Sequence, residues 1–93
     1  MSETVFISYA HIDGKPFAQK LSNSLAHRQC QVFFDEHSLP PGSNFIRVMQ
    51  DSILESKYFL AVLTPGHRRS DWCNDEWELA KRNGKHIIPV LAE

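Results

Sequence analysis

The sequence predicts an α/β fold, a flavodoxin-like doubly wound parallel sheet with helices on both faces. β-prone segments alternate with segments of helical spacing along the whole chain, in the order βαβαβαβ. One of them, Tyr58–Leu63, is continuously apolar, which is typical of a strand buried on both faces of a parallel sheet. Because crossovers between parallel strands are right-handed, we expect four strands in the order 2-1-3-4.

The first half of the chain predicts two strands with a helix between them. Val5–Tyr9 is short and β-prone. Pro16 suits the first turn of a helix, and the apolar residues that follow have helical spacing: Phe17, Ala18, Leu21 and Leu25. Gln31–Phe34 is the second predicted strand. Two prolines and a glycine then exclude regular structure from the loop Asp35–Gly42.

The second half predicts two further helices and two strands. Ser43 is a candidate N-cap for a helix with one apolar side: Phe45, Ile46, Met49 and Ile53. Thr64–Gly66 ends the strand Tyr58–Leu63, and Ser70 or Asp71 caps a third helix that ends near Asn83-Gly84. His86–Leu91 is the fourth strand. Its Pro89 cannot donate to a ladder, which indicates a sheet edge or a bulge.

Composition excludes several classes of protein. A chain of 93 residues with 42% hydrophobic and 23% charged residues predicts one globular domain, 1–93. The net charge is −1 without a basic block, which argues against nucleic-acid binding. The apolar run Phe59–Leu63 is too short to span a membrane. Cys30 and Cys73 form no CxxC, so we expect reduced thiols, a cytoplasmic location and no metal site.

The predicted topology places a ligand crevice at two loops. In the order 2-1-3-4 the direction of winding reverses between the first and third strands, and ligands bind outside the carboxyl ends of strands at such a reversal. The loops there are Ser8–Asp13 and Thr64–Cys73. The first of these loops contains neither the Rossmann nor the P-loop glycine pattern that binds phosphate. A phosphoacceptor receiver domain is set aside, because the third strand ends in Leu63-Thr64-Pro65 and not in aspartate.

Glu76 occupies a position where a hydrophobic residue is expected. On a helical wheel it lies within an apolar arc made by its neighbours: Trp72, Cys73, Trp77, Leu79 and Ala80. Burial of an unpaired carboxylate is costly, so the position needs a reason. A salt bridge, or a hydrogen bond to the N-terminus of another helix, is the structural alternative. The functional alternative is a carboxylate held at the crevice by an aromatic wall and suited to chemistry on a ligand.

Several motifs together resemble the TIR domain, the Toll and interleukin receptor homology domain. They cover nearly the whole chain in this order: Val5-Phe6-Ile7-Ser8-Tyr9 with Asp13, Val32-Phe33-Phe34-Asp35 with Leu39-Pro40-Pro41-Gly42, Phe59-Leu60-Ala61-Val62-Leu63-Thr64-Pro65, Ser70-Asp71-Trp72-Cys73-Asn74-Asp75-Glu76, and Ile88-Pro89-Val90. Each is weak alone, but five in register are specific.

The resemblance implies an NAD-cleaving enzyme with NAD as substrate and no cofactor. Glu76 resembles the catalytic glutamate of TIR domains that break the nicotinamide–ribose bond, and with Trp72 it fits the motif Trp-x-x-x-Glu. The implied substrate-binding residues are Tyr9, Ala10, His11, Leu39, Gly42 and Trp72. One carboxylate is consistent with this reaction, because nicotinamide leaves from a pyridinium and needs no general acid.

The same resemblance implies self-association through Asp35–Ser43 and a role in immune, antiviral or cell-death signalling. TIR domains usually continue with a helix, a strand and a helix, which we expect this chain to lack after Glu93. Whether the product is linear or cyclic stays open.

Alternative interpretations remain at this stage. A non-catalytic TIR module would scaffold signalling assemblies, and a nucleoside-transferring enzyme would prefer nucleosides to NAD. His11 is either a ligand contact or a passive loop residue. We expect His37, His67 and His86 to be solvated, and Cys73 to be an inert buried thiol.

Overall fold

The elements follow the predicted alternation of strands and helices. The structure is a computed structural model that describes residues 3–34 and 45–92. The strands of this part are β1 (Thr4–Ser8), β2 (Gln31–Phe34), β3 (Tyr58–Leu63) and β4 (His86–Leu91). Its helices are α1 (Lys15–His27), α2 (Phe45–Glu55), α3 (Pro65–Arg69) and α4 (Asp71–Arg82). The expectations for Leu39, Gly42 and the loop Asp35–Ser43 lie outside the described residues.

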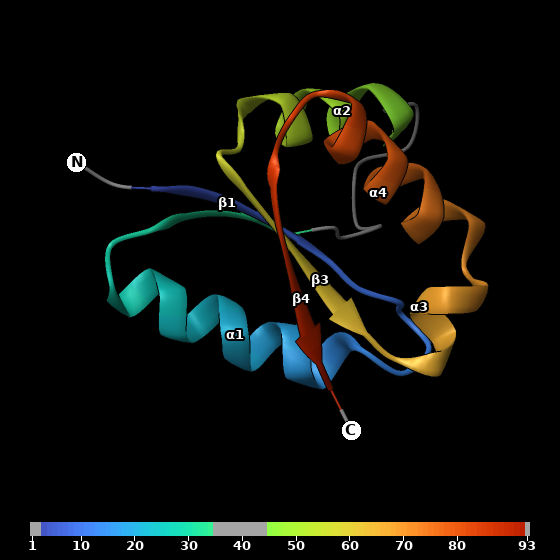
Figure 1. Cartoon of the computed structure of the whole chain (residues 1–93). Helices are drawn as coiled ribbons and strands as arrows, with labels where there is room; N and C mark the ends of the chain where they lie inside the picture. The colour runs from blue at the N-terminus through green and yellow to red at the C-terminus, as the bar shows by residue number, and fades with distance from the viewer. Residues whose placement is uncertain (1–2, 35–44, 93) are drawn as a thin grey trace.

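The strands form one parallel sheet in the predicted order β2-β1-β3-β4. The central strands β1 and β3 lie side by side (Figure 1), and their register pairs Phe6 with Phe59. β4 pairs with β3 alone among the described strands, so Pro89 lies on an edge strand, as its missing N–H predicts. The doubly wound fold is confirmed.

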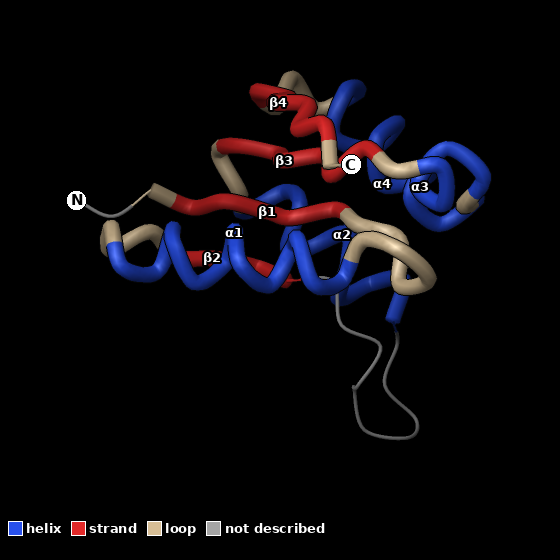
Figure 2. Tube along the Cα trace, turned by 90° about the horizontal axis from the view of Figure 1, so that it is seen from below, coloured by secondary structure: helices blue, strands red, loops and turns tan. Residues whose placement is uncertain are grey.

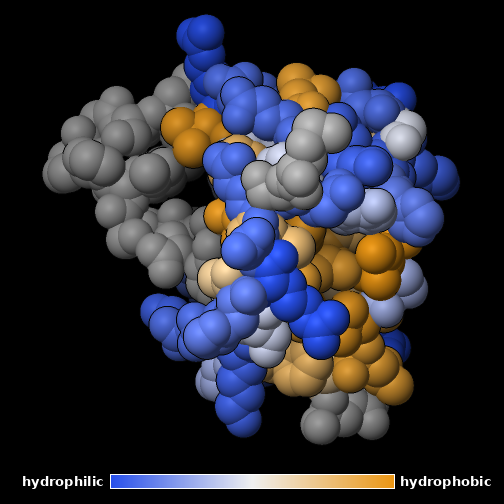
Figure 3. Space-filling view, turned by 90° about the vertical axis from the view of Figure 1, so that its left-hand side faces the viewer, coloured by the Kyte–Doolittle hydropathy of each residue, from blue (hydrophilic) through white to orange (hydrophobic). Residues whose placement is uncertain are grey.

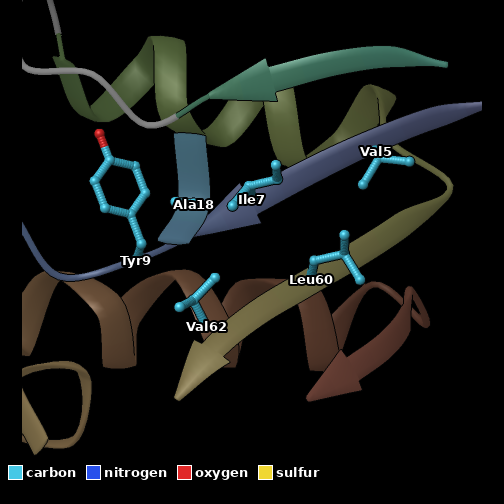
Figure 4. Close-up of a cluster of buried hydrophobic side chains, with 6 residues drawn as sticks. All are labelled: Val5, Ile7, Tyr9, Ala18, Leu60 and Val62. Carbon is cyan, nitrogen blue, oxygen red and sulfur yellow. The ribbon is translucent and has the colours of Figure 1, made fainter. Parts of the chain in front are cut away.

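Helices cover both faces of the sheet. Figure 2 shows α1 alone in front of the strands, with α2 and α4 behind them. A core cluster on the α1 side contains Val5 and Ile7 of β1, Leu60 and Val62 of β3, and Ala18 of α1, with Tyr9 just beyond the end of β1 (Figure 4). A second cluster unites Phe6, Phe59 and Ala61 with Met49 and Ile53 of α2 and Ala80 of α4. The sheet is therefore packed on both faces.

The alternation of side chains along β1 determines what each face receives. Val5 and Ile7 belong to the cluster on the α1 side, whereas Phe6 belongs to the cluster under α2 and α4. Ser8 is two residues beyond Phe6 and therefore points to the same face. Phe6 and Phe59 stack there with ring centroids 5.6 Å apart, and each buried aromatic of this kind contributes about 1.5–3 kcal/mol. Ser8 thus brings a hydroxyl group into the buried layer between the sheet and these helices.

The start of α4 was predicted from the sequence, whereas the helix before it was not. Ser70 caps α4, as expected, by accepting a hydrogen bond from the backbone N–H of Cys73 at 3.1 Å. The short helix α3 was not expected, since Thr64–Gly66 was interpreted only as the end of a strand. It forms because the Thr64 side chain accepts a hydrogen bond from the backbone N–H of His67 at 3.1 Å, and Pro65 suits the first helical turn.

Apolar surface is also present on the outside of the domain. Figure 3 shows it beside polar side chains on the face that lies at the left of Figure 1. The large apolar side chains that are exposed in the described part are Ile12, Phe17, Val48, Leu54 and Leu91. None of the helices in residues 3–34 and 45–92 has the length and apolar character needed to cross a membrane.

Candidate functional site

A cavity of about 430 Å³ opens at the carboxyl end of the sheet. It lies where the two predicted loops meet, at the reversal of strand order. Its lining comes from the loop after β1 and from α3 and the start of α4: Tyr9, Ala10, His11, Ile12, Gly66, Arg69, Ser70, Trp72 and Cys73. The structure therefore brings together four of the predicted substrate-binding residues, Tyr9, Ala10, His11 and Trp72.

Aromatic rings form one wall of the cavity. The ring of Tyr9 is fully buried and stacks on the imidazole of His11, with centroids 4.8 Å apart and an angle of 22° between the rings. His11 itself is exposed, so its outer face is accessible to a ligand. Trp72 is half-buried, and Cys73 beside it is buried, as expected for an inert thiol.

Glu76 lies one helical turn beyond Trp72 and Cys73 and is completely buried. The hydroxyl of Ser8 donates a hydrogen bond to its Oε1 atom at 2.8 Å. The fold places this serine there because β1 turns Ser8 to the face on which α4 packs. Glu76 does not line the cavity, although its helix supplies two residues that do.

His67 is buried, which corrects the expectation that it is solvated. Its side chain is 3% exposed, and its Nε2 atom lies 3.1 Å from Ser8 Oγ. Burial lowers the pKa of His67 below 6.5, while the charge of Asp13 acts weakly in the opposite direction. His86 is exposed, in agreement with prediction, and His37 lies outside the described residues.

Asp13 connects the two loops that form the cavity. Its carboxylate accepts hydrogen bonds from Thr64 Oγ1 at 2.6 Å and from the backbone N–H of Gly66 at 2.8 Å. These bonds lower the pKa of Asp13 below 3.8. An alanine Cβ at Gly66 would lie 2.5 Å from Asp13 Oδ1, so glycine leaves room for the carboxylate to reach its two donors.

The sequence reasoning missed the structural roles of Ser8, Asp13, Thr64 and His67. The Thr64-Pro65 pair is a recognisable helix start and was a usable signal. Ser8, a polar residue within an otherwise apolar strand, was a second usable signal. Nothing local indicates that His67 is buried, because its partners come from other elements. No metal-binding group of three or more side chains occurs in the part of the chain that the structure describes.

Comparison with known proteins assigns the family. A family model described as the TIR domain matches residues 5–93. The chain belongs to the TIR domain family.

Curated relatives of this TIR domain include enzymes that act on NAD. It is 31% identical over 87 residues to the NAD(+) hydrolase TcpA of Theionarchaea archaeon (strain DG-70-1), which covers 90% of this chain and 26% of that protein. It is 30% identical over 90 residues to the 2' cyclic ADP-D-ribose synthase AbTIR of Acinetobacter baumannii (strain 1295743), covering 92% of this chain and 34% of that protein. The TIR domain thus spans only about a quarter to a third of these relatives.

A solved structure agrees with the fold. The crystal structure of the TIR domain of the Toll-related receptor TRR-2 from Hydra magnipapillata superposes with a TM-score of 0.83. The identity is 23%, with 99% of this chain and 72% of that chain covered. The TIR domain therefore has the flavodoxin-type arrangement.

Proposed function

We propose that this TIR domain cleaves NAD at the nicotinamide–ribose bond, with Glu76 as the catalytic carboxylate. The single observation that carries the proposal is the position of Glu76: a completely buried carboxylate one helical turn behind the wall of the crevice. A carboxylate in such a place is rare unless it is used or well paired. Two relatives at about 30% identity act on NAD, which favours a catalytic role for this carboxylate.

The reaction needs one negative charge near the ribose. The bond between ribose C1′ and nicotinamide N1 breaks, and its electron pair moves to nitrogen and neutralises the pyridinium. The carboxylate of Glu76 stabilises the oxocarbenium charge on the ribose. Water then adds to C1′ and loses a proton to give ADP-ribose, or an internal nucleophile of the ADP-ribose closes a ring instead.

The cavity residues suit the remaining parts of NAD. His11, stacked on the buried ring of Tyr9, and Trp72 supply ring surfaces for a base or for nicotinamide. Arg69 at the rim supplies positive charge for the diphosphate. Ala10, Leu39 and Gly42, which the family resemblance implies as substrate-binding residues, complete the proposed NAD site.

Activation by self-association is part of the same proposal. The carboxylate of Glu76 is inaccessible in the single chain, so contact with ribose requires a movement of its side chain or of the adjacent loops. Assembly of several TIR domains would provide the energy for that movement. Activity is therefore expected to rise more steeply than protein concentration.

Nicotinamide release tests the proposal directly. The wild-type chain is incubated with NAD over a range of protein concentrations, beside Glu76→Gln and Glu78→Gln. Glu78 is an exposed glutamate on the same helix and is the matched control. We expect release by the wild type and by Glu78→Gln, and a loss of at least about 100-fold in Glu76→Gln. Equal release by both variants would remove Glu76 from the chemistry.

A scaffold without catalysis is the second candidate. The burial of Glu76 and its hydrogen bond from Ser8 favour it, because both are typical of a structurally satisfied carboxylate. It predicts no nicotinamide release at any concentration, with assembly intact in Glu76→Gln by sedimentation velocity. Free nucleosides included as alternative substrates test the nucleoside-transferring class at the same time.

A further inference from the structure

Three side chains from three elements form a buried hydrogen-bonded chain beneath the cavity. Ser8 of β1 lies between Glu76 of α4 at 2.8 Å and His67 of α3 at 3.1 Å. Ser8 and Glu76 are 0% exposed and His67 is 3% exposed. The proposed reaction has used only the carboxylate, so the other two groups need an explanation.

The direction of the hydrogen bonds follows from the number of protons. A serine hydroxyl has one proton, and that of Ser8 is donated to Glu76 Oε1. Ser8 Oγ can then only accept from His67, so the proton of the imidazole must be on Nε2. With that tautomer the order is His67 to Ser8 to Glu76, and the carboxyl oxygen at its end is the acceptor, as an ionised carboxylate requires.

The opposite direction would neutralise the carboxyl group. If His67 carried its proton on Nδ1, its Nε2 atom would accept from Ser8. Ser8 Oγ would then require a proton from Glu76, which would have to be a carboxylic acid. The tautomer of His67 and the ionisation of Glu76 are therefore coupled through one hydroxyl group.

The backbone around His67 holds its imidazole in place. Its N–H is bonded to the Thr64 side chain at 3.1 Å, and Thr64 also donates to Asp13. The ring lies 6.5 Å from that of Trp77 in an edge-on arrangement. The charge of Asp13, in the loop after β1, acts on the imidazole, Arg68 and Arg69 follow it on its own helix, and Glu76 of α4 is connected to it through Ser8.

We propose that His67 and Ser8 are positioning residues that hold Glu76 ionised and oriented, through a hydrogen-bond relay donated from His67 Nε2–H. Neither touches NAD in this mechanism, and both act through the carboxylate. The consequence for catalysis depends on the proposed function. The hydrogen-bond relay does not depend on the proposed function, because it exists in the chain without substrate.

Nitrogen NMR of the full chain tests the relay without any substrate. The two imidazole nitrogens have well-separated shifts that depend on which carries the proton. At about pH 7.5, above the ordinary imidazole pKa, we expect His67 to be neutral with the proton on Nε2. Ser8→Ala removes the acceptor and should produce a mixture of tautomers, whereas Ser24→Ala, an exposed serine on α1, should not. A proton on Nδ1 in the wild type would overturn the relay.

Kinetics of two His67 variants test the positioning role. The amide of His67→Gln can still donate to Ser8, whereas His67→Leu cannot donate. We expect His67→Leu to lower kcat about 10- to 100-fold with little change in KM, and His67→Gln to recover most of that loss. His86→Gln is the matched exposed control. Thermal unfolding of each variant verifies that it is folded.

The two proposals fail in distinguishable ways. Nicotinamide release that requires Glu76 but is the same in His67→Leu and His67→Gln would overturn the positioning role and leave the enzyme intact. Absence of release from the wild type would overturn the proposed function and with it the catalytic role of His67. The tautomer measured by NMR would still confirm or overturn the relay.

Discussion

Asp13 and Thr64 are joined by a hydrogen bond of 2.6 Å, although 51 positions separate them in the sequence. The same carboxylate accepts from the backbone of Gly66, so one side chain holds the loop after β1 against the start of α3. These two segments supply most of the cavity wall. The shape of the candidate site therefore depends on a contact that is outside the chemistry.

Asp13→Asn is expected to lower the thermal stability of the domain near neutral pH. Asparagine keeps the size of the side chain but loses the charge that strengthens both hydrogen bonds. Thermal unfolding followed by circular dichroism measures the change. Asp75→Asn, an exposed aspartate on α4, is the matched control and should have little effect.

The stability difference between wild type and Asp13→Asn should also depend on pH. The hydrogen bonds lower the pKa of Asp13 in the folded chain below its ordinary value of 3.8, so the unfolded chain binds the proton more readily. The contribution of ionised Asp13 to the stability of the folded chain is fully present above pH 3.8. It is lost as the pH falls through the pKa of Asp13 in the folded chain. A difference that persists unchanged in strong acid would contradict this origin.

Gly66→Ala should destabilise the domain and distort the cavity. The new Cβ would lie 2.5 Å from Asp13 Oδ1 and 2.7 Å from Ile12 Cγ2, so both side chains would have to move and the carboxylate would be pushed from its hydrogen bonds. We expect a loss of about 1–3 kcal/mol in the free energy of unfolding, measured in urea. Arg68→Ala changes an exposed residue of the same short helix and should cost much less. Equal effects would show that the close contact is relieved without strain.

Ser70→Ala should weaken the start of α4. Ser70 Oγ accepts from the backbone N–H of Cys73, in the first turn of the helix, where side-chain caps satisfy N–H groups. Loss of such a cap costs about 1 kcal/mol in the free energy of unfolding. Ser24→Ala, on the exposed side of α1, should be neutral because it caps nothing. A neutral Ser70→Ala would mean that water replaces the cap.

His11→Ala tests whether the exposed ring next to Tyr9 contacts the ligand. If the stacked pair forms a platform for a ring of NAD, removal of the outer imidazole should raise KM about 3- to 10-fold and leave kcat nearly unchanged. His11→Phe should restore the lower KM. His27→Ala, at the exposed end of α1, is the control. An unchanged KM in His11→Ala would support the passive interpretation of this histidine.

Much of the fold was predictable because the signals that define it are local. Gln31–Phe34, Tyr58–Leu63 and His86–Leu91 were predicted with the bounds they have, and β1 is displaced by one residue. The burial of Glu76 also followed from the sequence, since the period of an α-helix determines which side chains share a face. α3 was missed because a helix of five residues has too few positions to establish a period.

The sequence by itself determined the alternation of elements, the order of the strands, the location of the crevice and the inward position of Glu76. Only the tertiary structure decided what surrounds that carboxylate. Ser8 and Glu76 are 68 positions apart, and Ser8 and His67 are 59 apart. Their contacts depend on the face of β1 against which α4 packs and on the turn that α3 makes after β3. Periodicity describes neighbours along the chain, whereas a hydrogen-bonded chain across three elements exists only when all three have packed.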